Sequence, residues 1–222
     1  MRVVNRRHFI LAGALAGSSG YWTAVQARAA AGGKPVILVV GDSLSAEYGL
    51  KRGEGWVPLL EKRLAEQKIA ATVINASISG DTTAGGRARL AGLLSQHKPT
   101  HVVLELGGND ALRGLSLAGT EDNLMQMTKA AQAAGAQVLI VGIQVPPNYG
   151  SDYTQRFEAL FGKVAGATKA ALVPFLLKGV ADSPEAAALF QADRIHPTAA
   201  AQARMLDNVW PTLRKLLPAQ SG

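Results

Sequence analysis

Runs of consecutive apolar residues alternate along this chain with segments whose apolar residues recur every three or four positions. The first run, 36–40, contains only Val, Ile and Leu and ends at Gly41, which is typical of a strand buried on both faces of a sheet. The next segment has helical spacing, with apolar residues at Trp56, Leu59, Leu60 and Leu64. Parallel strands need crossover connections, so the alternation predicts an α/β fold with helices on both faces of a parallel sheet.

The alternation continues to the end of the chain and predicts five strands and five helices. The strands are expected at 36–40, 72–76, 102–106, 138–143 and 171–174. The helices are expected near 56–64, 82–96, 121–134, 152–168 and 198–216, with Pro211 inside the last of them. A chain of 222 residues, 48% of them hydrophobic, is long enough to bury one substantial core. It contains no internal repeat and no linker, so we expect a single domain over residues 30–222.

Residues 1–29 have the layout of a secretory signal peptide. They contain four arginines, no acidic residue, an apolar run at 9–17 and a small-residue end at Ala27-Arg28-Ala29. A membrane-spanning helix needs about 20 apolar residues, so this short run, interrupted by glycine, does not suit a stable membrane anchor. The pair Arg6-Arg7 resembles a twin-arginine export signal. We therefore expect cleavage near Ala29 and a periplasmic or secreted protein.

Composition excludes several classes of function. The absence of cysteine rules out disulfides, thiolate metal sites and a cysteine nucleophile. Without residues 1–29 the net charge would fall from +7 to +3, with 19 basic and 16 acidic residues, and no basic cluster with interleaved aromatics remains. His97 and His101 are four residues apart, but Pro99 between them breaks a shared helical face. We therefore expect a monomer that binds no nucleic acid, no metal and no cofactor.

Small and polar residues follow the predicted strands. The residues after the first three strands are Gly41-Asp42-Ser43-Leu44-Ser45, Ser77-Ile78-Ser79-Gly80-Asp81-Thr82 and Gly107-Gly108-Asn109-Asp110. Late in the chain stands Asp193-Arg194-Ile195-His196-Pro197. In open α/β sheets, ligands bind beyond the carboxyl ends of the strands. A hydroxyl, a glycine amide, a carboxamide and an Asp–His pair are thus expected on one edge of the sheet.

These groups have the chemistry that acyl transfer requires. Ser43, on a tight turn expected to lead into a helix, is the candidate nucleophile. His196 is the candidate general base, and Asp193, three residues earlier, is close enough to bond one ring nitrogen and select its tautomer. The amides of Ser43 and Gly80 and the carboxamide of Asn109 are candidate donors to a tetrahedral oxyanion.

Four blocks, in this order, resemble the signature blocks of the SGNH (GDSL) hydrolases: Gly41-Asp42-Ser43-Leu44-Ser45, Gly80, Gly108-Asn109-Asp110 and Asp193-x-x-His196. Segments 75–82, 106–114 and 146–150 are closer still to the bacterial branch of periplasmic thioesterase I, lysophospholipase and arylesterase. The likeness covers residues 35–217. It implies a flavodoxin-like three-layer α/β/α sandwich with a five-stranded parallel sheet, the site roles assigned above, and hydrolysis of carboxylic esters and thioesters of acyl chains.

Two residues near the expected site depart from the pattern of this family. Glu47 stands where relatives usually have a small residue, and Arg194 stands where many have glycine. Both positions bear on substrate preference rather than on catalysis. Asp42 and Asp110 lie inside the signature blocks, and we interpret them as residues that stabilise turns.

Two loops beside the nucleophile are expected to bind the substrate. Loop 111–120 carries Leu112, Leu115 and Leu117, and the turn after the fourth strand carries Asn148 and Tyr149. We take Leu112, Leu115, Asn148 and Tyr149 as the candidate substrate-binding residues. Leu112, Leu115 and Leu117 favour an acyl chain, such as that of a lysophospholipid, over a polar sugar.

Two other functions remain open at this point. A carbohydrate O-acetylesterase of the cell envelope would use the same catalytic groups on an acetylated sugar. A non-catalytic flavodoxin-like module for a flavin phosphate would need a phosphate-binding loop after the first strand, where the acidic Asp42 stands instead. The chain contains no G-x-S-x-G, G-x-G-x-x-G or P-loop lysine motif.

Overall fold

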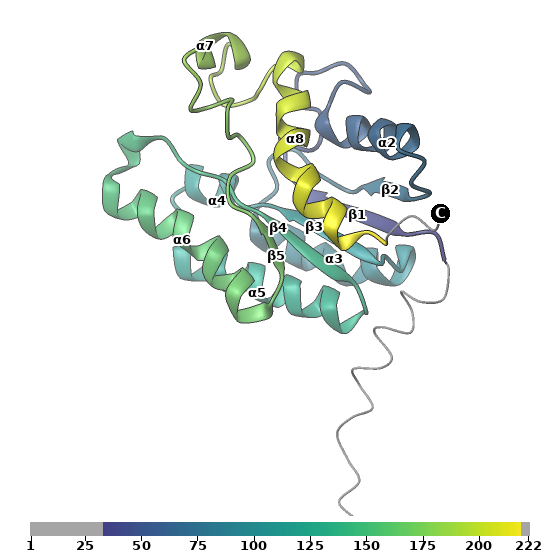
Figure 1. The fold of residues 1–222 in the computed structure, drawn as a ribbon. Helices are drawn as coiled ribbons and strands as arrows, with labels where there is room; N and C mark the ends of the chain where they lie inside the picture. Colours follow the sequence, from purple (N-terminus) through teal and green to yellow (C-terminus); the bar gives the residue numbers. More distant parts are fainter. Residues whose placement is uncertain (1–32, 219–222) are drawn as a thin grey trace, which may run out of the picture.

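The computed structural model describes residues 33–218, so the expected signal peptide lies outside the described residues. Five strands form one parallel sheet in the order β2-β1-β3-β4-β5 (Figure 1). The strands are β1 (Val36–Gly41), β2 (Thr72–Asn75), β3 (His101–Glu105), β4 (Gln137–Val141) and β5 (Ala171–Val173). This order is that of the flavodoxin-like fold, whose ligand site lies where the strand order reverses, between β1 and β3. The predicted α/β class and all five predicted strands are confirmed.

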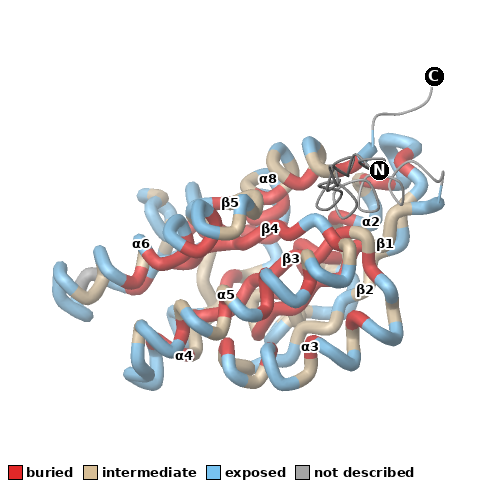
Figure 2. The backbone as a smooth tube through the Cα atoms, turned by 90° about the horizontal axis from the view of Figure 1, so that it is seen from below, coloured by how far each residue is buried: buried red, intermediate tan, exposed pale blue. Residues whose placement is uncertain are grey.

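Helices cover both faces of the sheet, as Figure 2 shows. Helix α2 (Trp56–Glu66) packs against α8 (Ala199–Leu216) on one face. Helix α3 (Thr83–His97) packs on the other face against α5 (Leu117–Ala133), which also contacts α6 (Ser151–Thr168). The five predicted helices are therefore present, and they form the two outer layers of the sandwich.

The core lies on both faces of the central strands. Residues 37–40 of β1 and 102–104 of β3 have no exposed area. In the sheet, Val39 lies opposite Asn75 of β2 and opposite Val103 of β3. Because helices cover both faces, these strands need apolar side chains at every position rather than at alternate ones. This requirement explains why continuous apolar runs predicted them.

Three short elements were not predicted: α4 (Gly108–Leu112), the 3-10 helix η1 (Pro147–Tyr149) and α7 (Ala186–Leu189). Helix α5 also begins at Leu117 rather than near 121, because the Ser116 hydroxyl accepts a hydrogen bond from the Gly119 amide and caps the helix. The expected loop 111–120 is therefore reduced to residues 113–116. Leu117, which was expected on that loop, packs against the core.

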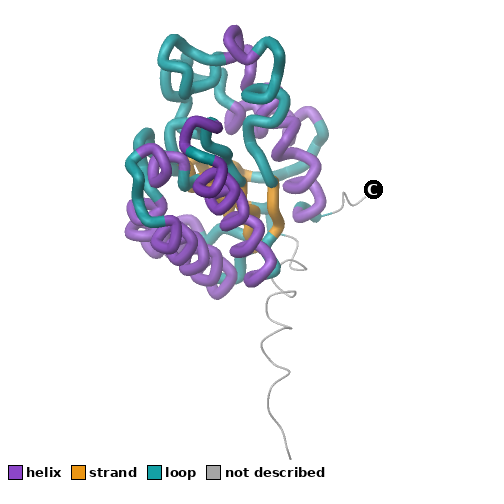
Figure 3. Tube along the Cα trace, turned by 90° about the vertical axis from the view of Figure 1, so that its left-hand side faces the viewer, coloured by secondary structure: helices purple, strands orange, loops and turns teal. Residues whose placement is uncertain are grey.

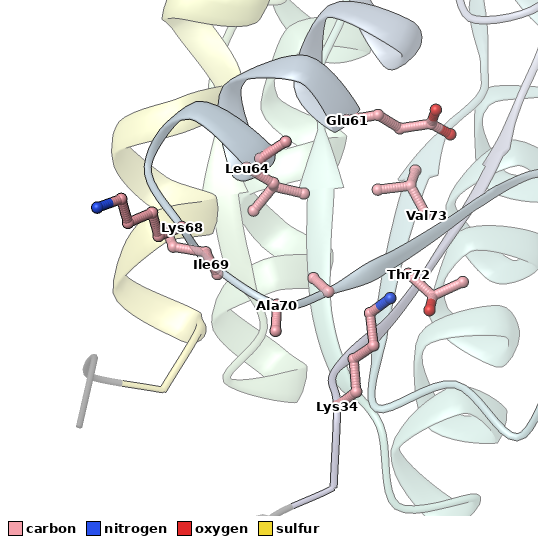
Figure 4. A pocket seen from close by; sticks show the side chains of 10 residues that line it. Lys34, Glu61, Leu64, Lys68, Ile69, Ala70, Thr72 and Val73 are labelled. Atoms are coloured by element: carbon pink, nitrogen blue, oxygen red, sulfur yellow. The ribbon is translucent and has the colours of Figure 1, made fainter.

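Loops lie at one end of the sheet, and a hollow lies at the other. Loops gather at one end of the molecule (Figure 3), as expected where parallel strands finish together. A hollow of about 560 Å³ lies at the other end, between the end of α2 and the start of β2, with Lys34 and Glu61 on opposite sides of it (Figure 4). Its lining includes none of the predicted site residues. Within residues 33–218, no helix combines the length and the apolar character needed to span a bilayer.

Candidate active site

Ser43 lies just beyond the end of β1, on a tight turn. The Asp42 carbonyl accepts hydrogen bonds from the amides of Ser45 and Ala46, at 3.2 and 3.0 Å. Turns continue to residue 49, and the next helix, α2, begins only at Trp56. The prediction that Ser43 enters a helix directly is therefore wrong. The chain instead makes hydrogen-bonded turns, so no helix N-terminus lies behind the hydroxyl.

His196 lies on a closed loop before α8. An antiparallel bridge joins Phe190 to Pro197 at the base of the loop. The Gln191 amide donates to the His196 carbonyl at 2.8 Å, and the Arg194 amide donates to the Gln191 carbonyl at 2.9 Å. These bonds hold the imidazole at the edge of the sheet where β1 ends.

A row of hydrogen bonds joins Asp193, His196 and Ser43. Oδ2 of Asp193 is 2.7 Å from Nδ1 of His196, and Nε2 of His196 is 2.9 Å from Oγ of Ser43. The other carboxylate oxygen, Oδ1, accepts the amides of Ile195 and His196 at 2.9 and 3.0 Å. These bonds to the carboxylate, that of the His196 amide foremost, lower the pKa of Asp193 to about 2. Asp193 is therefore ionised throughout the neutral range.

Gly80 is the third residue of a β-turn, in which the Asp81 amide donates to the Ile78 carbonyl at 3.0 Å. Its φ of 79° lies in the left-handed region, which fits glycine at this place in a type II turn. The Ile78 amide donates to the Gly41 carbonyl at 3.0 Å, and the Arg113 guanidinium donates to the Gly80 carbonyl at 2.7 Å. The turn is thus held against the end of β1, and its own hydrogen bond does not use the Gly80 amide.

Asp42 joins the Ser43 turn to Asn109, which lies in α4. Its Oδ1 accepts the Leu44 amide at 3.0 Å, and its Oδ2 accepts a hydrogen bond from Asn109 Nδ2, also at 3.0 Å. Burial raises the pKa of Asp42 to about 6, against the lowering effect of these two hydrogen bonds. A carboxamide nitrogen carries two hydrogens, so one N–H of Asn109 is left for a ligand.

Asp110 is buried and connects three helices. Its Oδ2 accepts the Thr83 amide, in the first turn of α3, at 2.8 Å. Its Oδ1 accepts the hydroxyls of Thr83 and Thr120, the latter at 3.1 Å. Because α3 begins shortly after the Gly80 turn, Asp110 sets the position of that turn relative to its chain neighbour Asn109.

The four predicted substrate-binding residues lie on the loops at this same end of the sheet. Leu112 ends α4 and Leu115 lies in the loop 113–116, while Asn148 and Tyr149 belong to η1 after the neighbouring strand β4. Leu112, Leu115 and Tyr149 are 45%, 42% and 37% exposed, and Asn148 is exposed as well. Leu115 therefore does not point into the core and is free to contact a ligand.

The model of the GDSL-like lipase/acylhydrolase family matches residues 39–204. The chain belongs to this family. It is 55% identical over 181 residues to Esterase TesA of Pseudomonas aeruginosa, covering 82% of this chain and 89% of that protein. It is 40% identical over 181 residues to thioesterase 1/protease 1/lysophospholipase L1 of Escherichia coli, covering 82% and 84%. The crystal structure of the psychrotrophic esterase EstA from Pseudoalteromonas sp. matches with a TM-score of 0.77 at 40% identity, covering 82% and 98%.

Membership of this family confirms the predicted resemblance and makes the chain an SGNH-type ester hydrolase. The two residues that depart from the family pattern share an unusual backbone conformation. Glu47 and Arg194 both have a φ of 59°, in the left-handed region that favours glycine. At Glu47 the side chain compensates, because its Oε1 accepts the amides of Gly53 and Gly55, both at 2.8 Å.

This member of the lipase/acylhydrolase family also has a buried hydrogen-bonded group beneath the turn after β1, which was not predicted. Glu105, which ends β3, is 2% exposed and accepts the Ser45 hydroxyl at 2.7 Å. Trp56 Nε1 donates to the same hydroxyl at 3.1 Å. A Cβ on Gly41 would lie 2.8 Å from both Glu105 Oε2 and Ser45 Oγ, so only glycine fits there. Burial, and next the charge of Asp42, raises the pKa of Glu105 well above its usual value.

Replacing Glu105 by glutamine is expected to flatten the decline of stability as the pH rises above the pKa of the unfolded carboxyl. The folded protein keeps the Glu105 proton where the unfolded chain, with a pKa of about 4.3, has released it. Its contribution to stability is complete below about pH 4 and is lost as the pH rises through the folded pKa. Glutamine cannot titrate, so the Glu105→Gln variant lacks this loss, which amounts to at most about 1.4 kcal/mol per pH unit.

Thermal melting at graded pH measures the effect. Glu61→Gln, at an exposed position of α2, is the matched control and should follow the parent protein. If the Tm of Glu105→Gln falls with rising pH as steeply as that of the control, the Glu105 carboxyl does not hold an extra proton in the folded protein.

Proposed function

We propose that this esterase hydrolyses esters and thioesters of acyl chains through a covalent acyl intermediate on Ser43. The proposal rests on the row in which Ser43 Oγ, the His196 ring and the Asp193 carboxylate are joined at 2.9 and 2.7 Å. Nε2 of His196 takes the hydroxyl proton as Oγ attacks the acyl carbon, and then returns it to the departing alcohol or thiol. Asp193, ionised at neutral pH, keeps the proton of the neutral ring on Nδ1 and stabilises the imidazolium.

A water molecule completes the reaction. His196 removes a proton from the water as its oxygen attacks the acyl carbon of the intermediate. The bond to Oγ then breaks, Ser43 regains its proton from the imidazolium, and the carboxylic acid leaves. No metal or cofactor is needed for either half of this sequence.

Negative charge on the acyl oxygen is the main electrostatic demand of both steps. We assign its stabilisation to the amides of Ser43 and Gly80 and to the side-chain amide of Asn109. The hydrogen bond from Asn109 to Asp42, at 3.0 Å, supports this role because it restrains the carboxamide before a substrate arrives.

The substrate class is inferred from the loops around Ser43. Leu112, Leu115 and Tyr149 are exposed there, and we propose that with Asn148 they line a groove for the acyl chain. Similar proteins named thioesterase and lysophospholipase agree with a substrate that carries such a chain. A marked preference for acetylated sugars over long acyl esters would instead favour a carbohydrate O-acetylesterase.

An organophosphonate ester tests the nucleophile directly, and the EstA structure is described as inhibited by monoethylphosphonate. We expect one adduct per chain, on the peptide that contains Ser43, together with complete loss of ester hydrolysis. Mass spectrometry of the digested protein locates the adduct. Labelling of another serine with loss of activity would overturn the assignment.

The Leu115→Asp variant is expected to lose activity on octanoyl or longer esters while keeping most of its activity on acetyl esters. A buried methylene contributes about 0.8 kcal/mol, so four extra methylenes in the groove are worth up to about two orders of magnitude in kcat/KM. A carboxylate at this position would replace that apolar wall with a charged one. The measurement is kcat/KM for acetyl and octanoyl esters, with a melting curve for each variant.

Ala118→Asp adds the same charge at an exposed position three residues further on and serves as the control. Because Leu115 is exposed, its replacement should leave the Tm close to that of the control. Equal losses on both esters, or no loss on either, would contradict the assignment of the groove.

We further propose that the chain is exported with the help of residues 1–29. Changing Arg6 and Arg7 together to lysine is expected to leave an uncleaved precursor in the cytoplasm, because the twin-arginine route requires that pair. Cell fractionation with mass spectrometry of the mature N-terminus, expected near Ala30, checks this. Normal export of the double variant would point to the general secretory route, and a retained Met1 in membrane fractions would point to an anchor.

A further inference from the structure

Large apolar side chains are exposed in one place on the described part of the chain. Six such residues are exposed among residues 33–218, and all lie on the segments that surround Ser43: Tyr48, Ile78, Leu112, Leu115, Tyr149 and Ile195. They come from the ends of four different strands and from the His196 loop. A concentration of exposed apolar side chains on a soluble protein marks a surface that contacts something else.

Three of these six residues are not part of the proposed acyl groove. Ile78 and Ile195 are 52% and 46% exposed and flank the groups assigned to catalysis rather than the groove. Tyr48 is 49% exposed, and its ring lies 4.3 Å from the ring of His196, centre to centre. Together with the groove residues they lie on the loops at the end of the sheet that carries Ser43, and we call these six residues the apolar rim.

Cationic side chains accompany the apolar rim on the same segments. Lys51, Arg52, Arg113 and Arg194 are all exposed, and none of them has an ion pair within residues 33–218. Arg113 lies between the two exposed leucines, and Arg194 is the neighbour of Ile195. The rim therefore presents apolar and positive groups together.

The carboxylates on these segments are held by the protein itself. Glu47 accepts two backbone amides at 2.8 Å, and Glu54 accepts the Lys51 amide at 3.0 Å. Asp81 pairs with Arg89 at 2.8 Å, and Asp193 is bonded to the His196 ring. The carboxylates on these segments are thus bonded within the protein, whereas the side chains of Lys51, Arg52 and Arg194 have no ion pair within residues 33–218. At the same end, Glu185 before α7 is exposed and likewise has no ion pair in the described part of the chain.

We propose that the apolar rim and its four cations dock this protein onto an anionic phospholipid surface, with Ser43 facing the headgroups. Exposed Lys and Arg are attracted to anionic headgroups, while exposed apolar side chains enter the boundary between headgroups and acyl chains. A second copy of the chain is a poorer partner, because two rims facing each other would oppose like charges. The benefit of docking rests on the proposed function, since it would bring an acyl ester from the surface to the nucleophile, but docking itself does not require hydrolysis.

Vesicle binding tests the proposal without catalysis. The protein is the Ser43→Ala variant of the chain from Ala30 onward, because residues 33–218 hold the whole sheet and core and the apolar segment 9–17 would bind lipid by itself. Co-sedimentation is measured with neutral phosphatidylcholine vesicles and with vesicles that also contain phosphatidylglycerol. We expect binding to the anionic vesicles that weakens as salt is raised. No binding at low salt, or equal binding to both vesicles, would overturn the proposal.

A charge reversal locates the docking surface. The pair Lys51→Glu and Arg52→Glu is expected to weaken binding to anionic vesicles by about 30-fold or more, since two attractive contacts become repulsive. The matched control reverses Lys129 and Lys215, two exposed lysines near the ends of α5 and α8, at the end of the sheet opposite the rim. Equal weakening in both variants would mean attraction by net charge alone and would overturn the assigned surface.

A tryptophan at Ile78 reports contact with lipid. In the Ile78→Trp variant we expect a blue shift of fluorescence on binding that the parent lacks, because Trp56 is buried and Trp210 lies on α8 away from the rim. Sedimentation with vesicles but without this shift would exclude docking through the rim. Concentration-dependent dimers that disappear in the Leu115→Asp variant, with no vesicle binding by the parent, would assign the rim to a second copy.

Discussion

Replacing Ser43 by alanine is expected to lower kcat for ester hydrolysis by about 10⁴-fold or more, because the oxygen that forms the acyl intermediate is removed. The substitution deletes one partly buried oxygen whose bond, to His196 Nε2, lies at the surface of the site. The melting temperature should therefore change little. Initial rates of hydrolysis of a short acyl ester by the parent and by the variant measure the effect.

The matched control is Ser79→Ala, which removes a hydroxyl from an exposed serine on the next loop and should retain the parent's rate. Activity of Ser43→Ala within tenfold of the parent would refute the serine mechanism. The same result would also remove the proposed catalytic role of the Asp193, His196 and Ser43 side chains.

The Asn109→Ala variant is expected to lower kcat by about 10²–10³-fold, the usual effect of removing one donor to an oxyanion. The loss should appear in kcat with little change in KM, because the oxyanion exists only in the transition state and intermediates. Asp42, which accepts the Asn109 amide at 3.0 Å, loses a partner in this variant, so the Tm should fall modestly as well.

Asn109→Asp separates the donor role from simple packing. It keeps the shape of the side chain but has no N–H to donate, and it places a second carboxylate against Asp42. We expect a loss of kcat at least as large as that of the alanine variant. A change confined to KM in both variants would remove Asn109 from the oxyanion site and make it a residue of substrate binding.

The strands were predictable because a strand buried on both faces needs apolar residues at every position. The runs 36–40, 102–104 and 138–141 meet this requirement and lie in β1, β3 and β4, whereas the edge strand β2 begins and ends on the exposed polar residues Thr72 and Asn75. Short elements at the strand ends were not predictable in this way. Helix α4 spans only Gly108–Leu112, which is too short for a periodic pattern, and its Asp110 is bonded to Thr83 and Thr120 of two other helices.

The candidate site was visible in the sequence because the carboxyl ends of parallel strands meet at one edge. Ser43, Gly80 and Asn109 each follow a strand of the same sheet, so their placement could be expected from topology alone. The pairing of Asp193 with His196 could also be expected, since three residues of chain allow one hydrogen-bonded loop. Their chemistry and their order along the chain are properties of the sequence.

Only the tertiary structure decided what lies behind and around these groups. Glu105 is a charged residue at the end of an apolar strand, but its burial against Ser45 and the consequent rise of its pKa depend on Trp56 and on the packing of α2. The exposure of Leu115 likewise depends on α5 starting at Leu117, through the Ser116 cap. A sequence pattern reports which residues are apolar or polar and how they are spaced. Burial, charge state and exposure follow from contacts between segments far apart in the chain.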